Sequence, residues 1–133
     1  MNCLDGQIIN LISDNNMTII DLNVSGSSLK TIIIETPDSA SFLKIGNHLN
    51  IMFKETEVNL AKDFIGKISL QNRLNCSVKN INKGKLLSQI NLNFHSNDIS
   101  AIITTCDAES LELKENDTVI ALIKSTEIMV APK

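Results

Sequence analysis

The chain has 133 residues, of which 43% are hydrophobic and 20% are charged, a composition typical of one ordinary globular domain or two very small ones. No apolar run approaches the roughly 20 residues that a membrane-spanning helix needs, and the first ten residues lack the basic and apolar regions of a secretory signal. We therefore expect a cytoplasmic protein that does not associate with membranes. The formal net charge of −3 argues against a general nucleic-acid binder.

The cysteines and histidines offer little for redox or metal chemistry. Cys3, Cys76 and Cys106 are widely separated and form no C-x-x-C pair, and only His48 and His95 could join them as metal ligands. This spacing predicts neither a disulfide framework nor a zinc site. We expect reduced, mostly buried thiols and histidines in surface turns.

The first half of the chain reads as short strands separated by turns. Alternation of apolar and polar residues predicts strands over residues 6–12, 18–24, 29–34 and 49–54. Asp, Asn, Ser and Gly at 14–16 and 25–28 are typical of the turns between the first three strands. A short helix is expected near residues 38–42, before the last of these strands.

The second half follows the same plan. Strands are predicted over residues 74–81, 86–94, 99–104 and 118–123, with a hairpin turn at 82–85. A short helix is expected over 107–113, with Asp107 as its N-cap, and the polar run at 114–117 ends it. Each half thus consists of several short strands with one small helix before the last.

The two halves are copies of one sequence pattern at a constant offset of 70 residues. Identical residues recur through turns as well as strands, as in the pairs Asn2 and Asn72, Ile20 and Ile90, Ile33 and Ile103, and Lys54 and Lys124. We therefore predict a duplicated module, with one copy over residues 1–63 and the second over residues 64–133. The predicted fold class is all-β with one short helix per module, arranged as two tandem five-stranded OB-like barrels.

Three segments of the second copy resemble a known family. They are NRLNCSVKNINKGKLLSQINLNF at 72–94, ISAIITT at 99–105 and LELKENDTVIALIKSTEIMV at 111–130. Together they resemble the molybdate-binding Mop domain, also called the molbindin or TOBE-type domain. The resemblance is good over residues 69–130 and weaker over residues 2–60. It implies a tandem di-Mop protein that binds molybdate or tungstate for molybdenum storage or homeostasis. It also implies a homo-oligomer with its anion sites between modules.

The resemblance implies a set of oxyanion-binding residues. In the family, one side of the site carries the pattern Ser-Ala-Arg-Asn, which falls on residues 69–72, and the other carries Lys-Ala or Lys-Ser after the closing strand. A third family position, Ile-Thr at the end of the third strand, falls on residues 103–104. The expected oxyanion-binding residues are therefore Ser69, Leu70, Gln71, Thr104, Lys124 and Ser125. Hydroxyls, backbone N–H groups and one cation suit a tetrahedral dianion.

Two departures from the family pattern distinguish the copies. Gln71 replaces the family's Arg and removes a cation, although its amide can still donate. In the first copy Glu55 stands where the second has Ser125, and a carboxylate repels a dianion. Residues 1–63 hold 4 basic and 8 acidic side chains, whereas residues 64–133 hold 8 and 7. We expect a degenerate site in the first module and the better-matched site in the second.

Two other functions remain open from the sequence. The first is a structural or regulatory oligomerisation module whose anion site has decayed, which Gln71 and Glu55 make reasonable. The second is an OB-fold binder of single-stranded nucleic acid, which the absence of Trp and Tyr disfavours because such proteins stack bases on aromatic rings. No arrangement of nucleophile, base or metal ligands indicates an enzyme.

Overall fold

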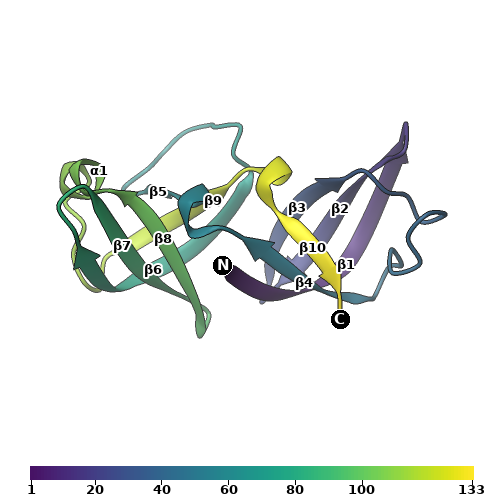
Figure 1. Ribbon diagram of the computed structural model, residues 1–133, viewed down its shortest axis with the longest axis horizontal. Coiled ribbons are helices and arrows are strands. Elements are labelled where there is room, and N and C mark those ends of the chain that lie inside the picture. The colour runs from purple at the N-terminus through teal and green to yellow at the C-terminus, as the bar shows by residue number, and fades with distance from the viewer.

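The computed structural model describes residues 1–133 as two β-sheet lobes lying side by side (Figure 1). The first half of the chain supplies the strands β1 (Asn2–Asp14), β2 (Met17–Val24), β3 (Ser27–Ile33), β4 (His48–Phe53) and β5 (Asn59–Ala61). The second half supplies β6 (Asn72–Lys83), β7 (Leu87–Phe94), β8 (Asn97–Thr104), β9 (Thr118–Ile123) and β10 (Met129–Pro132). One α-helix, α1 (Thr105–Ser110), and two 3₁₀ turns, η1 (Glu55–Glu57) and η2 (Ser125–Glu127), complete the fold.

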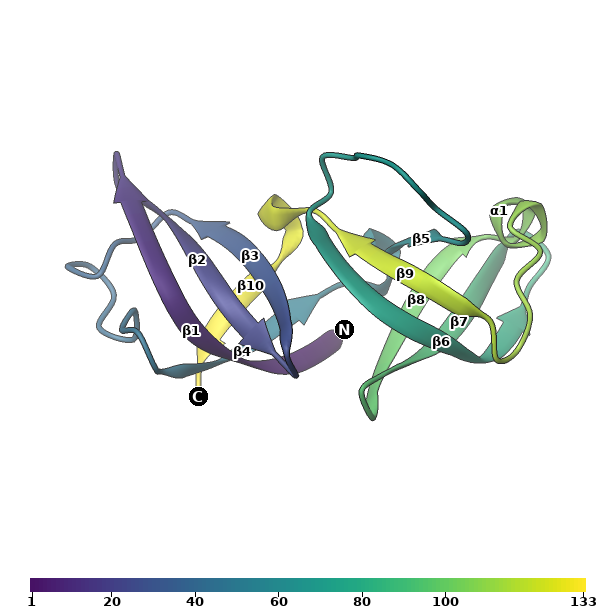
Figure 2. The same cartoon turned by 180° about the vertical axis from the view of Figure 1, so that it is seen from behind.

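The two five-stranded sheets exchange their last strands. The first sheet has the order β10-β4-β1-β2-β3 and the second has the order β5-β9-β6-β7-β8. All pairings are antiparallel, including β10 with β4 and β5 with β9. Each lobe is therefore completed by a strand from the other half of the chain, and η1 and η2 lie where the chain crosses between lobes (Figures 1 and 2).

The structure repeats at the offset of 70 residues that the sequence predicts. β1 and β6 begin at Asn2 and Asn72, and both strands have a register shift at the same place, between Ile8 and Asn10 and between Val78 and Asn80. All eight predicted strands are present, most of them one to four residues longer at one end or both than predicted. β5 and β10 were not predicted.

The prediction of one short helix in each module is wrong for the first module, where residues 36–42 form turns. In the second module the helix begins after Thr104, whose hydroxyl accepts a 3.1 Å hydrogen bond from the Asp107 backbone N–H. Thr104 is therefore the N-cap, and not Asp107 as predicted. At the same offset the first module has Ile34, which offers no capping oxygen, and Pro37, which has no N–H to be capped.

Alternating strand residues form one hydrophobic core that runs through both lobes. Its largest fully buried side chains include Phe53 and Phe94, and Phe42 packs against it half-buried. Phe64 is also half-buried, under the Arg73 guanidinium at 5.7 Å from the ring centroid. No aromatic ring is therefore fully exposed for stacking. No helix of the structure has the length and apolar character needed to cross a membrane.

The cysteines differ from expectation, because only one of the three is buried. Cys3 and Cys106 are exposed and Cys76 is buried, and all three are free thiols. Burial raises the pKa of the Cys76 thiol to about 12, so this group stays protonated and unreactive at neutral pH.

Candidate functional site

The pairing of β6 with β9 brings most of the predicted site together. Asn72, the first residue of β6, is paired with Ile123, the last residue of β9. The segments just outside this pair therefore meet at one end of the second sheet. On one side is the segment from Ser69 to Gln71, and on the other are Lys124 and Ser125.

Three polar side chains at this end of the sheet have no partner within the chain. The Ser69 and Ser125 hydroxyls make no side-chain hydrogen bond, and the Lys124 ammonium makes neither a hydrogen bond nor an ion pair, although the ammonium groups of five other lysines do at least one of these. Ser69 and Lys124 are exposed and Ser125 is half-buried. This end of the sheet thus offers two hydroxyls and a cation to a ligand.

Gln71 is partly committed to its own loop. Its side-chain amide donates a 2.8 Å hydrogen bond to the Ile68 carbonyl, which leaves the second N–H of the amide free. Leu70 is half-buried and contributes only its backbone as a donor. The Gln71 side chain thus holds the loop, at the position where the family pattern has an Arg.

Thr104 does not join the other predicted residues within one chain. It lies at the end of β8 opposite Leu87, next to the β6–β7 hairpin and therefore at the other end of the second sheet from Asn72. Its exposed hydroxyl accepts the capping hydrogen bond of α1. One chain alone therefore does not assemble the complete predicted set.

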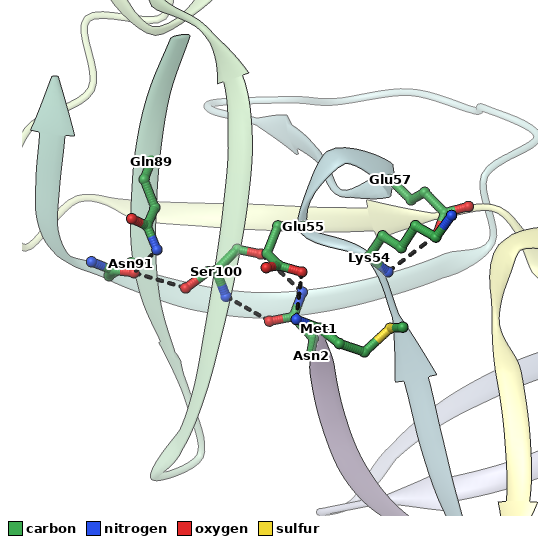
Figure 3. Close-up of polar contacts among 8 residues, drawn as sticks. All are labelled: Met1, Asn2, Lys54, Glu55, Glu57, Gln89, Asn91 and Ser100. Atoms are coloured by element: carbon green, nitrogen blue, oxygen red, sulfur yellow. Dashed lines mark hydrogen bonds and ion pairs between the residues drawn. The ribbon is translucent and has the colours of Figure 1, made fainter. Parts of the chain in front are cut away.

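The equivalent place in the first module is occupied by an ion pair. Asn2 pairs with Phe53, so Met1 lies beside Lys54 and Glu55. The Met1 ammonium is 2.7 Å from Glu55 Oε1 (Figure 3). This hydrogen bond holds the pKa of the Glu55 carboxyl below its usual value, and a backbone hydrogen bond adds to the effect. A permanent negative charge thus stands where the second module has the Ser125 hydroxyl.

Sequence reasoning missed the contacts that join the two lobes beside the site. The Asn72 side chain accepts a 2.7 Å hydrogen bond from the Lys30 backbone N–H and donates a 2.8 Å bond to the Lys30 carbonyl. Asn2 makes the same pair of bonds to the Ser100 backbone (Figure 3), at 2.8 and 2.9 Å. Lys30 and Ser100 are themselves 70 residues apart, so the interface repeats like the modules. The recurrence of an Asn directly before each apolar alternation is the signal that could have revealed it.

A carboxyl group next to the site has a shifted pKa. The pKa of Glu127 is raised, chiefly by burial and then by the hydrogen bond and repulsion of Glu57, while the Lys124 charge acts in the opposite direction. Glu57 and Glu127 are equivalent residues of the two modules and both are half-buried. They therefore face each other across the lobe interface as like charges.

Replacing Glu127 with Gln should stabilise the protein at neutral pH. A carboxyl whose pKa is raised in the folded state does not oppose folding while it is protonated. Once it ionises, it destabilises the folded protein, so stability falls as the pH rises through and above the ordinary pKa of 4.5. Thermal unfolding of Glu127→Gln and wild type should coincide at pH 3.5 and diverge by pH 7, where the variant gains up to about 1 kcal/mol. If the variant and wild type are equally stable at both pH values, Glu57 and Glu127 do not repel each other.

Comparisons with known proteins agree with this architecture. The TOBE domain family matches residues 68–130, a range that contains all six predicted site residues. The fold is similar to that of the cytoplasmic molybdate-binding protein ModG, solved with molybdate bound, with a TM-score of 0.92 at 22% identity over 99% of this chain and 96% of that chain.

A smaller structure is similar to part of the chain. A molybdate binding protein from Sporomusa ovata is 37% identical over 51% of this chain and 100% of that one, with a TM-score of 0.48. No curated protein sequence matches significantly. The likeness to ModG shows that the two-lobed fold extends over nearly the whole chain, and the second half of the chain, residues 68–130, belongs to the TOBE domain family.

Proposed function

We propose that this protein binds molybdate or tungstate reversibly, as a non-enzymatic oxyanion-binding protein of the cytoplasm that serves molybdenum storage or homeostasis. The observation that carries the proposal is the set of unpartnered donors at one end of the second sheet, Ser69, Lys124 and Ser125, within a TOBE domain. The ModG-like fold supports it, because that protein binds molybdate.

The chemistry of these donors suits a tetrahedral dianion. Molybdate presents four oxygens and two negative charges, so it needs several converging donors and at least one cation. Lys124 supplies the charge, Ser69 and Ser125 supply hydroxyls, and the backbone around Leu70 and Gln71 supplies N–H groups. Molybdate and tungstate are nearly equal in size and charge, so the same donors serve both.

The distant position of Thr104 supports a homo-oligomer. We propose that Thr104 of a second copy approaches the free donors and completes the site, in a dimer or trimer. In this proposal the chain consists of two modules, over residues 1–63 and 64–133, and each lobe is an OB-like barrel that one module forms together with the strand exchanged from the other, β10 or β5. The Glu55 carboxylate makes the first module structural or a weak site, and neither nucleic acid nor membrane is a partner.

Ligand-dependent thermal unfolding, with the assembly checked by light scattering, tests the proposed function. Molybdate and tungstate at a hundredfold excess over Kd should each stabilise the protein by about 2.7 kcal/mol, and sulfate should not. Stabilisation by neither ion in an intact oligomer would contradict the proposal and favour an assembly module with a decayed site. Retention of single-stranded DNA at low salt would instead favour a nucleic-acid binder.

A further inference from the structure

One strand of the first lobe contacts both segments that form the candidate site in the second lobe. The Thr31 hydroxyl on β3 donates a 2.8 Å hydrogen bond to the Ile128 carbonyl oxygen, and the Ser125 carbonyl oxygen, 3.2 Å away, is a second acceptor of the same O–H. The neighbouring residue, Lys30, binds the Asn72 side chain through its backbone. Adjacent residues of an edge strand therefore hold η2 on one side and the start of β6 on the other.

Thr31 is placed where its hydroxyl acts only on η2. Its side chain is fully buried, at 0% exposure, and its two hydrogen-bond acceptors are the carbonyls of the first residue of η2 and of the residue that follows η2. Because a buried hydroxyl needs a partner, the chain from Ser125 to Ile128 is fixed at both ends of the 3₁₀ turn. This turn carries the Ser125 hydroxyl and follows directly on Lys124.

The η1 turn of the first module lacks a counterpart of the contact between Thr31 and η2. Ala101 stands 70 residues after Thr31, is equally buried at 0% exposure, and has no hydroxyl. The η1 turn that contains Glu55 therefore receives no corresponding bond from β8. The Asn contacts occur in both modules, whereas the Thr hydroxyl supports only the turn of the better-matched site.

We propose that Thr31 is a positioning residue for the oxyanion site of the second module, so that the first lobe serves as a built-in support for it. This inference rests on the proposed function of that site. The Thr31 hydroxyl fixes the η2 backbone before the anion arrives, and Lys124 and Ser125 are thereby held toward the ligand. Partners that orient ligating groups in metal sites typically affect affinity by 10- to 100-fold.

The test compares two buried threonines by calorimetric titration with molybdate. Thr31→Val removes the supporting hydroxyl, while Thr18→Val removes an equally buried one whose partners, the Glu35 carbonyl and the Ser13 hydroxyl, belong to the first module. Both variants should be less stable than wild type. Only Thr31→Val should lose affinity, by about tenfold, and Thr31→Ser should restore it.

The outcomes separate positioning from general stability. If wild type binds molybdate and Thr31→Val binds equally well, or both valine variants lose affinity alike, positioning by Thr31 is overturned while the proposed function stands. If wild type binds no molybdate, both fall together. Should Thr31→Val not fold, Thr31→Ala replaces it in the same comparison, since the second module has an alanine, Ala101, at the equivalent buried position.

Discussion

Replacing Ser125 with glutamate should abolish molybdate binding. The substitution gives the second module the residue that the first has at Glu55, and thus places a carboxylate where we propose that the dianion binds. At a separation of 4 Å and an effective dielectric constant of 20, a carboxylate and a dianion repel each other by about 8 kcal/mol. Even a quarter of that energy weakens binding by roughly 30-fold.

Calorimetric titration of Ser125→Glu, Ser125→Ala and Thr56→Glu checks this result. Ser125→Ala removes a hydroxyl without adding charge and should weaken binding by about tenfold, because one hydrogen bond to a charged group contributes about 1.5 kcal/mol or more. Thr56→Glu adds the same net charge to the exposed η1 turn of the first module and should leave affinity nearly unchanged. Saturable binding by Ser125→Glu at wild-type affinity would remove Ser125 from the site.

Replacing Lys124 with alanine is expected to weaken molybdate binding by on the order of 30- to 1,000-fold. Lys124 is the cation at the proposed site, since Gln71 stands where the family pattern has Arg. Loss of one charged partner from a dianion costs about 2–4 kcal/mol, which corresponds to that change in Kd. Because Lys124 is exposed and makes no ion pair within the chain, the variant should fold and assemble like wild type.

Lys54→Ala provides the matched control for Lys124→Ala. Lys54 is the equivalent residue of the first module, is also exposed, and is followed by Glu55. Both variants lower the net charge equally, so any general effect of charge on anion affinity appears in both. Unchanged affinity in Lys54→Ala beside a large loss in Lys124→Ala would assign the cation to the second module. Equal losses would show that the site is shared or lies elsewhere.

Local patterns predicted the strands and the repeat because both depend on residues close in sequence. The alternation of apolar residues gave the eight strands, and the offset of 70 placed the turns. The helix near residues 38–42 failed for a local reason as well, since Ile34 and Pro37 lack the groups that cap α1. The exchange of β5 and β10 depends on how the lobes pack against each other, and the alternation of residues along one strand does not indicate such a contact.

The candidate site was predictable only in part for the same reason. The antiparallel pairing of Asn72 with Ile123 follows from the strand predictions, and it places Gln71 beside Lys124. The support from Lys30 and Thr31 comes from a strand more than 40 residues away in sequence, in the other lobe. Thr31 reads as an ordinary polar residue of an edge strand until the lobes are brought together.

Calorimetric titration of the wild-type protein with molybdate, in the presence of excess sulfate, tests the central claim most directly. The account predicts saturable binding that survives sulfate, with one ion per chain, because the first module carries Glu55 at the equivalent place. The absence of saturable binding would contradict it. A stoichiometry of two equivalent ions per chain would contradict the assignment of the site to the second module alone.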